Sequence, residues 1–391
     1  MKTLSALILI ALCVTLYINR EIIFTSDPKE SAVTPQPKPV SAVPSKVKSI
    51  DECLENGDFA DALSLLDKKD IKQQNSDWMR KRVEALDGLG QRKEALKLVE
   101  ILISKVNEGK RPDILWIKAS ILNDEGDKKN AGQVYYSIIE KFPNHGKALD
   151  AAIILNKIWK PWLKKSGKVA DLPKYNKILA FIIENGYDEQ LKKVAYENLK
   201  IINARLFFSP YKYEGIVDFH QIKHGDFLSV IAKKNKIYSE RIARANGLKN
   251  VNDIKVNQSL RLILGKSEIK ISKSKYSMHL YIGGLFFKHY QIGIGKNDLT
   301  PIVSTTISKS RAKNPTYTGP SGDMLENSHP DNPIGSRWLG FTMGQGLGIH
   351  GTREPDSIGK NMSNGCIRMH NRDVEEIYDY VMVGTEVVID P

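Results

Sequence analysis

The sequence predicts a multidomain protein with three folded parts: an N-terminal α-helical repeat region, a small domain of strand-helix-helix-strand order, and a C-terminal β-rich domain. Three observations support this. Apolar residues recur with the 3.6-residue period of helices over residues 50–205. Short strand and helix signals alternate over residues 216–264. In residues 267–391 apolar and polar residues alternate with a period of two, as they do in strands. A chain of 391 residues is also long enough for two to four domains.

The N-terminus has the form of an export signal. Lys2 precedes an uncharged run of fifteen residues, Leu4–Ile18. That run is short for a spanning helix, and no clear small-x-small cleavage site follows, so residues 1–24 are either a cleaved signal peptide or a single membrane anchor. Cys13 follows Leu12 and not a small residue, so we interpret it as an apolar residue and not as a lipidation site. Both alternatives place the remainder outside the cytoplasm, in the periplasm or envelope facing the cell wall.

Charge and composition, together with export, narrow the classes of partner that the protein could bind. The formal net charge of +13 suits nucleic acid, a lipid surface or an acidic envelope polymer without choosing among them. Export favours the envelope and not nucleic acid. Residues 25–49 contain five prolines and no apolar period, which predicts an extended linker of roughly 3 Å per residue. Such a linker would suit a protein that faces the cell wall.

The helical region, residues 50–205, contains an internal repeat. Its three copies are NGDFADAL (56–63), LGQRKEAL (89–96) and EGDKKNAG (125–132). Each copy has a glycine that allows a tight turn and, five residues later, an alanine that lets the second helix pack closely on the first. The pattern resembles degenerate tetratricopeptide repeats. It implies a module that docks a protein partner or acts as a spacer; a helical domain with no separate partner is the alternative.

The second part, residues 216–264, has a recognisable set of apolar and turn residues: Ile222, Gly225, Asp226, Leu228, Ile231, Ala232, Ile242, Asn246, Gly247, Leu248, Ile254, Gln258 and Leu260. This set resembles the βααβ LysM domain. Two positions depart from that family, which usually has an aromatic residue at the place of His220 and glycine at the place of Asn257. Most of the matching positions are core or turn residues that the fold alone would need.

The LysM resemblance implies a function. In that family a groove between the first strand-helix loop and the second helix-strand loop binds glycan that contains N-acetylglucosamine. The corresponding glycan-binding candidates are Gly225, Asp226, Phe227, Leu228, Asn250 and Ile254.

The third part, residues 267–391, alternates apolar and polar residues as strands do, for example in STTIS and in the final VVID. A polar stretch rich in Gly and Pro, residues 308–341, separates the strand signals and predicts a lid or binding flap. A single helix is predicted in NRDVEEIYDYV. Asn371 is its predicted N-cap, and Asp373, Glu375 and Glu376 are acidic residues near its first turn.

Two cysteines remain beyond the export signal, Cys53 and Cys366, in parts that belong to different domains. A disulfide framework is therefore not expected. Cys53 begins an apolar-periodic helix and is predicted to be core. Cys366 lies in SNGCIRMHN, sixteen residues after His350, with glycines beside both.

A cysteine near a histidine has a specific chemical use. A thiol becomes an effective nucleophile when a neighbouring imidazole accepts its proton, so Cys366 and His350 are candidates for acyl transfer through a thioester. The backbone N–H groups of Gly365 and Cys366 could form an oxyanion hole. Two alternatives stay open at this point: Cys366 as a small buried residue, and a zinc site of Cys366 with His370, His350 and His329. No second cysteine is available for zinc, and the spacing is unfamiliar.

Five motifs occur in order through the third part: TPIVSTTI, DNPIGSRWLGF, GIHGT, SNGCIRM and VGTEVVI. This constellation closely resembles the catalytic domain of L,D-transpeptidases. The resemblance implies a β-rich fold of mixed strands with a Cys–His site under a mobile loop. It also implies that Cys366 is the nucleophile, that His350 is the general base, and that the backbone carbonyl of Gly351 orients the imidazole.

The resemblance also implies roles around the nucleophile. Ser363 and Gly365 match the residues that shape the nucleophile loop, and Arg368 matches a basic residue near the substrate. Asn364 is a departure, because many members have histidine there. An amide can donate a hydrogen bond but cannot take a proton, so an acid-base role is lost at that position.

The activity implied is peptidoglycan cross-linking. The thiolate attacks the third-residue carbonyl of a tetrapeptide stem, D-alanine leaves, and the amine of another stem completes a third-to-third cross-link. Water, a free D-amino acid or a lipoprotein lysine are alternative acceptors, and water would make the protein an L,D-carboxypeptidase. No metal or organic cofactor is required. The alternative from another class is a non-catalytic scaffold that binds peptidoglycan.

Overall fold

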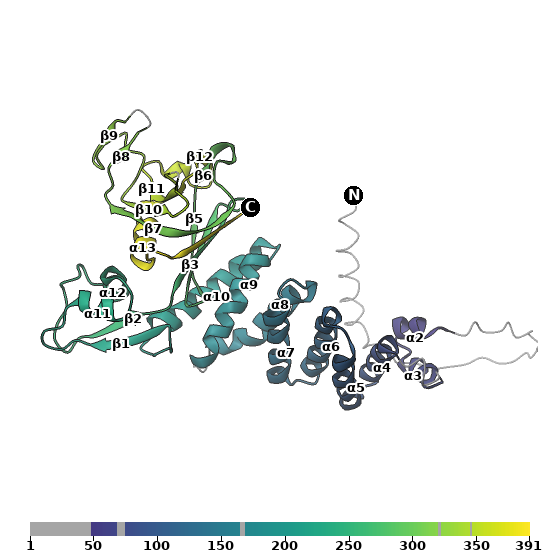
Figure 1. Cartoon of the computed structure of the whole chain (residues 1–391). Helices are drawn as coiled ribbons and strands as arrows, with labels where there is room; N and C mark the ends of the chain where they lie inside the picture. The colour runs from purple at the N-terminus through teal and green to yellow at the C-terminus, as the bar shows by residue number, and fades with distance from the viewer. Residues whose placement is uncertain (1–47, 69–74, 165–168, 320–321, 345) are drawn as a thin grey trace, which may run out of the picture. The chain divides into compact units, whose positions relative to one another are not determined.

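The computed structural model describes residues 48–68, 75–164, 169–319, 322–344 and 346–391 (Figure 1). The predicted signal or anchor, residues 1–24, lies outside these ranges, as does nearly all of the predicted linker, residues 25–49. Among the residues described, no helix combines the length and the apolar character that crossing a membrane requires. Residues 50–391 form one compact unit.

Helices follow one another from residue 50 to residue 208. They are α2 (Ile50–Asn56), α3 (Phe59–Asp67), α4 (Ser76–Gly88), α5 (Arg92–Lys105), α6 (Arg111–Asp124), α7 (Lys128–Lys141), α8 (Gly146–Lys164), α9 (Leu172–Asn185) and α10 (Glu189–Phe208). The region was predicted to end at residue 205, and α10 continues for three residues more.

The predicted repeat turns have the backbone that glycine allows. Gly57, Gly90 and Gly126 have φ of +78°, +74° and +84°, in the left-handed region that other residues rarely adopt. The alanines five residues after them are fully buried, so both physical reasons for the repeat hold. The resemblance to tetratricopeptide repeats in particular stays a prediction.

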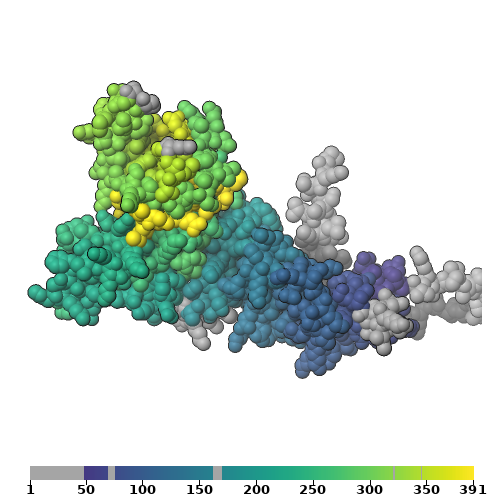
Figure 2. All heavy atoms as spheres, in the orientation of Figure 1, coloured from purple at the N-terminus to yellow at the C-terminus, as the bar shows by residue number. Residues whose placement is uncertain are grey.

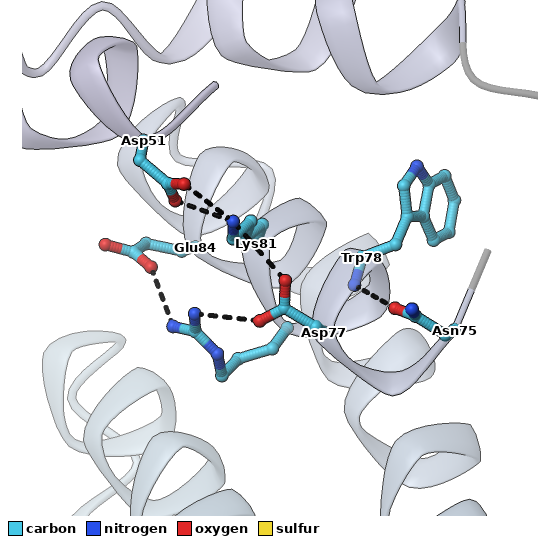
Figure 3. A network of polar contacts seen from close by, with 7 residues as sticks. Asp51, Asn75, Asp77, Trp78, Lys81 and Glu84 are labelled. Atoms are coloured by element: carbon cyan, nitrogen blue, oxygen red, sulfur yellow. Dashed lines mark hydrogen bonds and ion pairs between the residues drawn. The ribbon is translucent and has the colours of Figure 1, made fainter. Parts of the chain in front are cut away.

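A polar network joins α2 to α4 at the start of the helical region (Figure 3). Lys81 of α4 reaches Asp51 of α2 at 2.7 Å and Asp77 at 3.3 Å. The side chain of Asn75 caps α4 by accepting from the N–H of Trp78 at 3.0 Å. Exposed ion pairs contribute only about 0–1 kcal/mol each. The network therefore adds little to the stability of this region, and an apolar core that includes the buried Cys53, as predicted, lies beside it.

The second part has the predicted βααβ order: β1 (Val217–Gln221), α11 (Leu228–Lys234), α12 (Ser239–Ala245) and β2 (Ser259–Ile263). The two strands pair antiparallel, and the helices supply most of a small apolar core. Asn257, where the LysM family usually has glycine, has φ of +68°. Asparagine tolerates this left-handed backbone better than most residues, which explains how the departure is accommodated.

The third part is built on an eight-stranded sheet of order β13-β11-β10-β7-β14-β3-β4-β5. The strands are β3 (Ser267–Ser272), β4 (Ser277–Ile282), β5 (Leu285–Gln291), β6 (Ile294–Gly295), β7 (Val303–Lys313), β8 (Tyr317–Thr318), β9 (Met324–Leu325), β10 (Arg337–Phe341), β11 (Gly348–Gly351), β12 (Asn361–Ser363), β13 (Ile367–Met369) and β14 (Glu386–Asp390). In this sheet β3 and β14 are parallel, as are β11 and β13, and the other pairs are antiparallel. The mixed sheet agrees with the predicted fold class.

The two edges of this sheet meet. Just beyond β5, Gly293 exchanges backbone hydrogen bonds with Arg368 of β13, at 2.9 Å in each direction. The sheet therefore curls so that its first and last strands are joined next to the predicted nucleophile. In Figure 2 the residues nearest the C-terminus, in yellow, form part of the surface of this domain.

The predicted helix is present as α13 (Asn371–Tyr380), but its N-cap was assigned wrongly. His370 is the N-cap, and Asn371 is the first helical residue. The side chain of Asn371 is used elsewhere: its Oδ1 accepts from the backbone N–H of Ser336 at 3.0 Å. This bond holds the start of β10 against the helix.

The predicted flap, residues 308–341, is shorter than expected. Strand β7 extends to Lys313 and β10 begins at Arg337, because both strands pair within the sheet despite their polar sequence. The segment between them contains the short hairpin β8–β9. Its organising residue is the buried Asn332, whose Nδ2 donates to the carbonyl oxygens of Pro315 and Leu325 at 3.1 and 3.0 Å.

Candidate active site

Cys366 lies at the turn between β12 and β13, and hydrogen bonds fix this turn. The hydroxyl of Ser363 donates to the carbonyl of Cys366 at 2.6 Å and accepts from the N–H of Gly365 at 3.1 Å. The buried hydroxyl of Thr300 donates to the carbonyl of Gly365 at 3.0 Å. Gly365 has φ of +111°, and a Cβ there would lie 3.0 Å from the carbonyl oxygen of Leu299. Glycine is therefore required at this position.

One part of the predicted oxyanion hole needs correction. The N–H of Gly365 already donates to Ser363, so it does not point to a substrate in this structure. Of the predicted pair, the N–H of Cys366 remains the candidate donor.

His350 lies on β11, and Cys366 comes directly before the neighbouring parallel strand, β13. In the register of β11 and β13, His350 pairs with Arg368. The side chains of His350 and Arg368 therefore belong to one face of the sheet, and Cys366 precedes Arg368 by two residues, about 6.6 Å in extended backbone. Within the described ranges no hydrogen bond joins Cys366 to His350; instead the thiol donates to the carbonyl of Gly346 at 3.6 Å. Catalytic contacts are often this loose before a substrate binds.

The imidazole of His350 is held in one tautomer. Its Nδ1 lies 2.5 Å from the carbonyl oxygen of Gly351, which is the contact that the resemblance implied. A carbonyl can only accept, so Nδ1 carries the proton and Nε2 is left to accept one. A Cβ at Gly351 would lie 2.1 Å from Oδ1 of Asn371, so the close approach requires glycine here.

Trp338 is a part of this site that the sequence analysis missed. It pairs with His350 across β10 and β11, and the two rings stack with centroids 5.9 Å apart and planes at 28°. Its indole Nε1 donates to the hydroxyl of Ser310 at 3.0 Å, which fixes the ring. The only signal in the sequence was a tryptophan in the strand before GIHGT.

Burial sets the protonation of the reacting pair. His350 is 5% exposed, and this burial lowers its pKa to about 4, with a smaller lowering from the charge of Arg368 and an opposing effect of the hydrogen bond to Gly351. Burial also raises the pKa of the Cys366 thiol, against a backbone hydrogen bond with Gly348 and the charge of Arg368. Near neutral pH the resting pair is therefore a neutral thiol and a neutral imidazole, not a preformed ion pair.

Two polar residues flank the pair. Arg368 forms an ion pair with Glu354, with Nη1 and Oε2 2.6 Å apart. The side chain of Arg368 is 12% exposed and that of Glu354 is 62% exposed. Glu354 was not singled out from the sequence, because it is fourteen residues from its partner. Asn364, the departure from the common motif, is exposed beside the turn.

The zinc alternative would need several ligands in one place. Among the described residues there is no group of three or more His, Cys, Asp or Glu side chains placed to hold a metal ion. His370 is the N-cap of α13, and His329 lies within the flap, where its Nδ1 is 3.9 Å from Asp331. The geometry therefore gives the zinc alternative no support.

The LysM candidates lie in two loops, and they differ in what they can contact. Gly225 has φ of +88°, which suits the turn before α11. The carboxylate of Asp226 accepts from the ring of His220 at 2.8 Å and from the N–H of Lys223 at 2.9 Å, and these bonds hold the pKa of Asp226 below its usual value. Asp226 therefore shapes the loop. The neighbouring Phe227 is 66% exposed and presents its ring to solvent.

Leu228 is buried at the start of α11, and its side chain packs within the apolar core. Its part in glycan binding stays a prediction. In the second loop, Oδ1 of the exposed Asn250 accepts from the N–H of Asn252 at 2.9 Å. Ile254 is half-buried and packs against the same core.

The fold and this site define the class: a β-rich domain that carries a cysteine and a histidine in neighbouring parts of its sheet and follows a βααβ domain. The L,D-transpeptidase catalytic domain of the YkuD family matches residues 266–389, and the LysM domain matches residues 220–262. The Bacillus licheniformis protein YkuD, assigned to the L,D-transpeptidases, is 33% identical over 182 residues, which are 44% of this chain and 98% of that protein. The Bacillus subtilis protein YqjB, similarly assigned, is 44% identical over 105 residues, 26% of this chain and 57% of that protein.

The chain belongs to the L,D-transpeptidase family. Among solved structures, an L,D-transpeptidase from Mycobacterium tuberculosis is similar at 18% identity over 36% of this chain and 75% of that one, with a TM-score of 0.28.

Proposed function

We propose that this protein is an exported peptidoglycan L,D-transpeptidase. The observation that supports it best is the imidazole of His350, whose Nδ1 is held by the carbonyl of Gly351 and which lies on the strand next to the one that Cys366 precedes. The two matched domains indicate an exported protein associated with the cell wall.

The first half-reaction releases D-alanine. Nε2 of His350 takes the thiol proton as the sulfur of Cys366 attacks the carbonyl of the third residue of a tetrapeptide stem. The N–H of Cys366 stabilises the oxyanion. The C–N bond to D-alanine then breaks, His350 returns its proton to the leaving amine, and a thioester remains on Cys366.

The second half-reaction transfers the acyl group. The side-chain amine of another stem attacks the thioester, His350 removes the amine proton, and the C–S bond breaks. The thiolate takes a proton back, and a third-to-third cross-link is formed. Water in the acceptor's place would give an L,D-carboxypeptidase. Because the resting pair is neutral, the proton moves during the attack, when substrate has excluded water from the site.

The other parts would bring the substrate to this site. The LysM domain would bind glycan, with the exposed ring of Phe227 as its main apolar contact. Local binding of this kind raises the effective concentration of attached stems. The helical region would dock a protein partner or act as a spacer.

The test follows D-alanine release from a disaccharide-tetrapeptide by mass spectrometry, together with dimer formation and the covalent adduct. The protein lacking residues 1–24 would be compared with Cys366→Ala, and we expect a loss of at least about 10⁴-fold in rate. Cys53→Ala is the matched control, because that thiol is buried in another core and should be dispensable. Unchanged activity in Cys366→Ala would rule out the cysteine mechanism. An inactive wild type with every acceptor would favour the non-catalytic scaffold.

A further inference from the structure

Arg368 is a nearly buried cation beside the nucleophile, and its hydrogen bonding is incomplete. It pairs with His350 across the sheet, and its charge acts on the thiol of Cys366, two residues before it. Its Nε is buried and has no hydrogen-bond partner among the described residues. Its Nη1 is held by Glu354 at 2.6 Å. A guanidinium with an unpaired donor can gain a hydrogen bond when one anionic partner is exchanged for another.

Glu354 is anchored by its backbone and not by its carboxylate. Its N–H donates to the hydroxyl of Thr352 at 3.0 Å, and its carbonyl accepts from the hydroxyl of Ser357 at 2.6 Å. The side chain is mostly exposed, so its carboxylate can leave Arg368 while the turn stays in place. Because the carboxylate of Glu354 faces solvent, solvent screens its attraction to Arg368, and a substrate group can compete with it.

The donor stem supplies a suitable competitor. The D-alanine that leaves ends in a carboxylate, whose carbon is about 4 Å from the scissile carbonyl carbon. Arg368 lies about 6.6 Å along the strand from the cysteine that attacks this carbonyl. The planar fork of arginine matches a carboxylate in two parallel hydrogen bonds.

We propose that Glu354 occupies, in the free enzyme, the place that the terminal carboxylate of the donor stem takes on Arg368. Glu354 is then an internal competitor that sets the affinity for carboxylate-ended donors. This inference rests on the proposed function for its donor. The electrostatic relation between Glu354, Arg368 and the thiol does not depend on turnover.

Two donors that differ only at the C-terminus test the competition. One tetrapeptide ends in a carboxylate and the other in a carboxamide. Glu354→Gln should lower KM for the carboxylate donor by up to about 5-fold, with kcat within about 2-fold, because 1 kcal/mol is about that factor. KM for the carboxamide donor should not change. Asp356→Asn, an exposed acid in the same loop, controls for net charge. Equal changes for both donors would overturn the proposal.

A second measurement needs no turnover. In a Cys53→Ala background, the alkylation rate of Cys366 by iodoacetamide would be followed against pH. Removing the Glu354 charge leaves that of Arg368 uncompensated, so the profile should move to lower pH, and free D-alanine should protect Glu354→Gln more strongly than the unsubstituted background. In Glu354→Gln with Arg368→Gln both effects should vanish. An unmoved profile with unchanged protection would overturn the proposal. If these effects appear while no donor is turned over, the proposed function fails and the ion-pair relation stands.

Discussion

The catalytic domain has two very different polar regions: the seam where helices cover strand β5, and the site around Cys366. At the seam, Asn176 of α9 completes the edge of the sheet. Its Oδ1 accepts from the N–H of Phe286 at 2.9 Å, and its Nδ2 donates to the carbonyl of Phe286 at 2.8 Å. Asn203 of α10 donates to the carbonyl of Phe287 at 2.8 Å. The helices thus satisfy an edge strand that would otherwise expose unpaired backbone.

The site is arranged in the opposite way. The thiol of Cys366 contacts only backbone groups, those of Gly346 and Gly348, and the imidazole of His350 has one hydrogen bond that leaves Nε2 free among the described residues. At the seam every carboxamide group named above is paired, which gives rigidity. At the site donors and acceptors are left for a substrate. The difference teaches that the seam carries stability, whereas the site keeps reactive groups incompletely bonded.

The largest effect is expected from a substitution that disrupts the site and leaves the seam intact. His350→Gln removes the base and keeps a hydrogen-bond donor near Gly351, so the fold should persist. We expect D-alanine release to fall by about 10²–10⁴-fold, as for loss of a general base. Steady-state kinetics and urea unfolding of the same preparation check this. If His350→Gln lost activity only because it had unfolded, urea unfolding would show a large loss of stability. That result would contradict our division between site and seam.

The next largest effect is expected from a substitution that disrupts the seam and leaves the site intact. Asn176→Ala removes three hydrogen bonds and leaves the buried N–H and carbonyl of Phe286 with fewer partners. We expect the free energy of unfolding to fall by about 3 kcal/mol, because each buried polar group left without a partner costs about 1–3 kcal/mol. Urea unfolding measures it. Asn185→Ala, at the exposed end of the same helix, is the matched control and should change stability by less than about 1 kcal/mol. Similar losses in both variants would argue against a special role for the seam.

The site and the seam also differ in how much of each could be predicted from the sequence. Cys366 and His350 were found because motifs in order carry them, and the strands and helices followed from local periodicity. Asn176 gave no signal, because its partner Phe286 is 110 residues away and a polar residue on a helix usually faces solvent. Asn371 was misplaced as an N-cap for the same reason: its distant partner, Ser336, is unknown until the chain has folded. Local rules predict local bonds, and the polar residues that join distant segments lie beyond them.

The smallest expected effect is on the pH dependence of stability, to which each region contributes one buried histidine. His279 lies at the seam, where its Nε2 is 3.3 Å from the hydroxyl of Tyr196 and its ring faces His289, with Lys270 and Lys275 nearby. Burial lowers the pKa of His279 to about 3, as it lowers that of His350 to about 4. Both pKa values are below the unfolded value near 6.5, so between these limits the unfolded chain binds more protons than the folded one. Stability therefore falls as the pH drops below about 6.5, and the loss is complete only below the folded pKa.

At pH 5 each histidine should cost about 2 kcal/mol relative to pH 7.5. His279→Gln keeps a polar group near Tyr196 and cannot take the proton. Its unfolding free energy should therefore fall between these two pH values by about 2 kcal/mol less than that of the wild type. For His350→Gln, the decrease in unfolding free energy between these pH values should be smaller than in the wild type by a similar amount. Urea unfolding at both pH values measures the differences. If only His279→Gln reduced the acid sensitivity, protonation at the site would be tolerated in the folded state. The site would then differ from the seam in giving a charged imidazole a stable place, which is what a base in proton transfer needs.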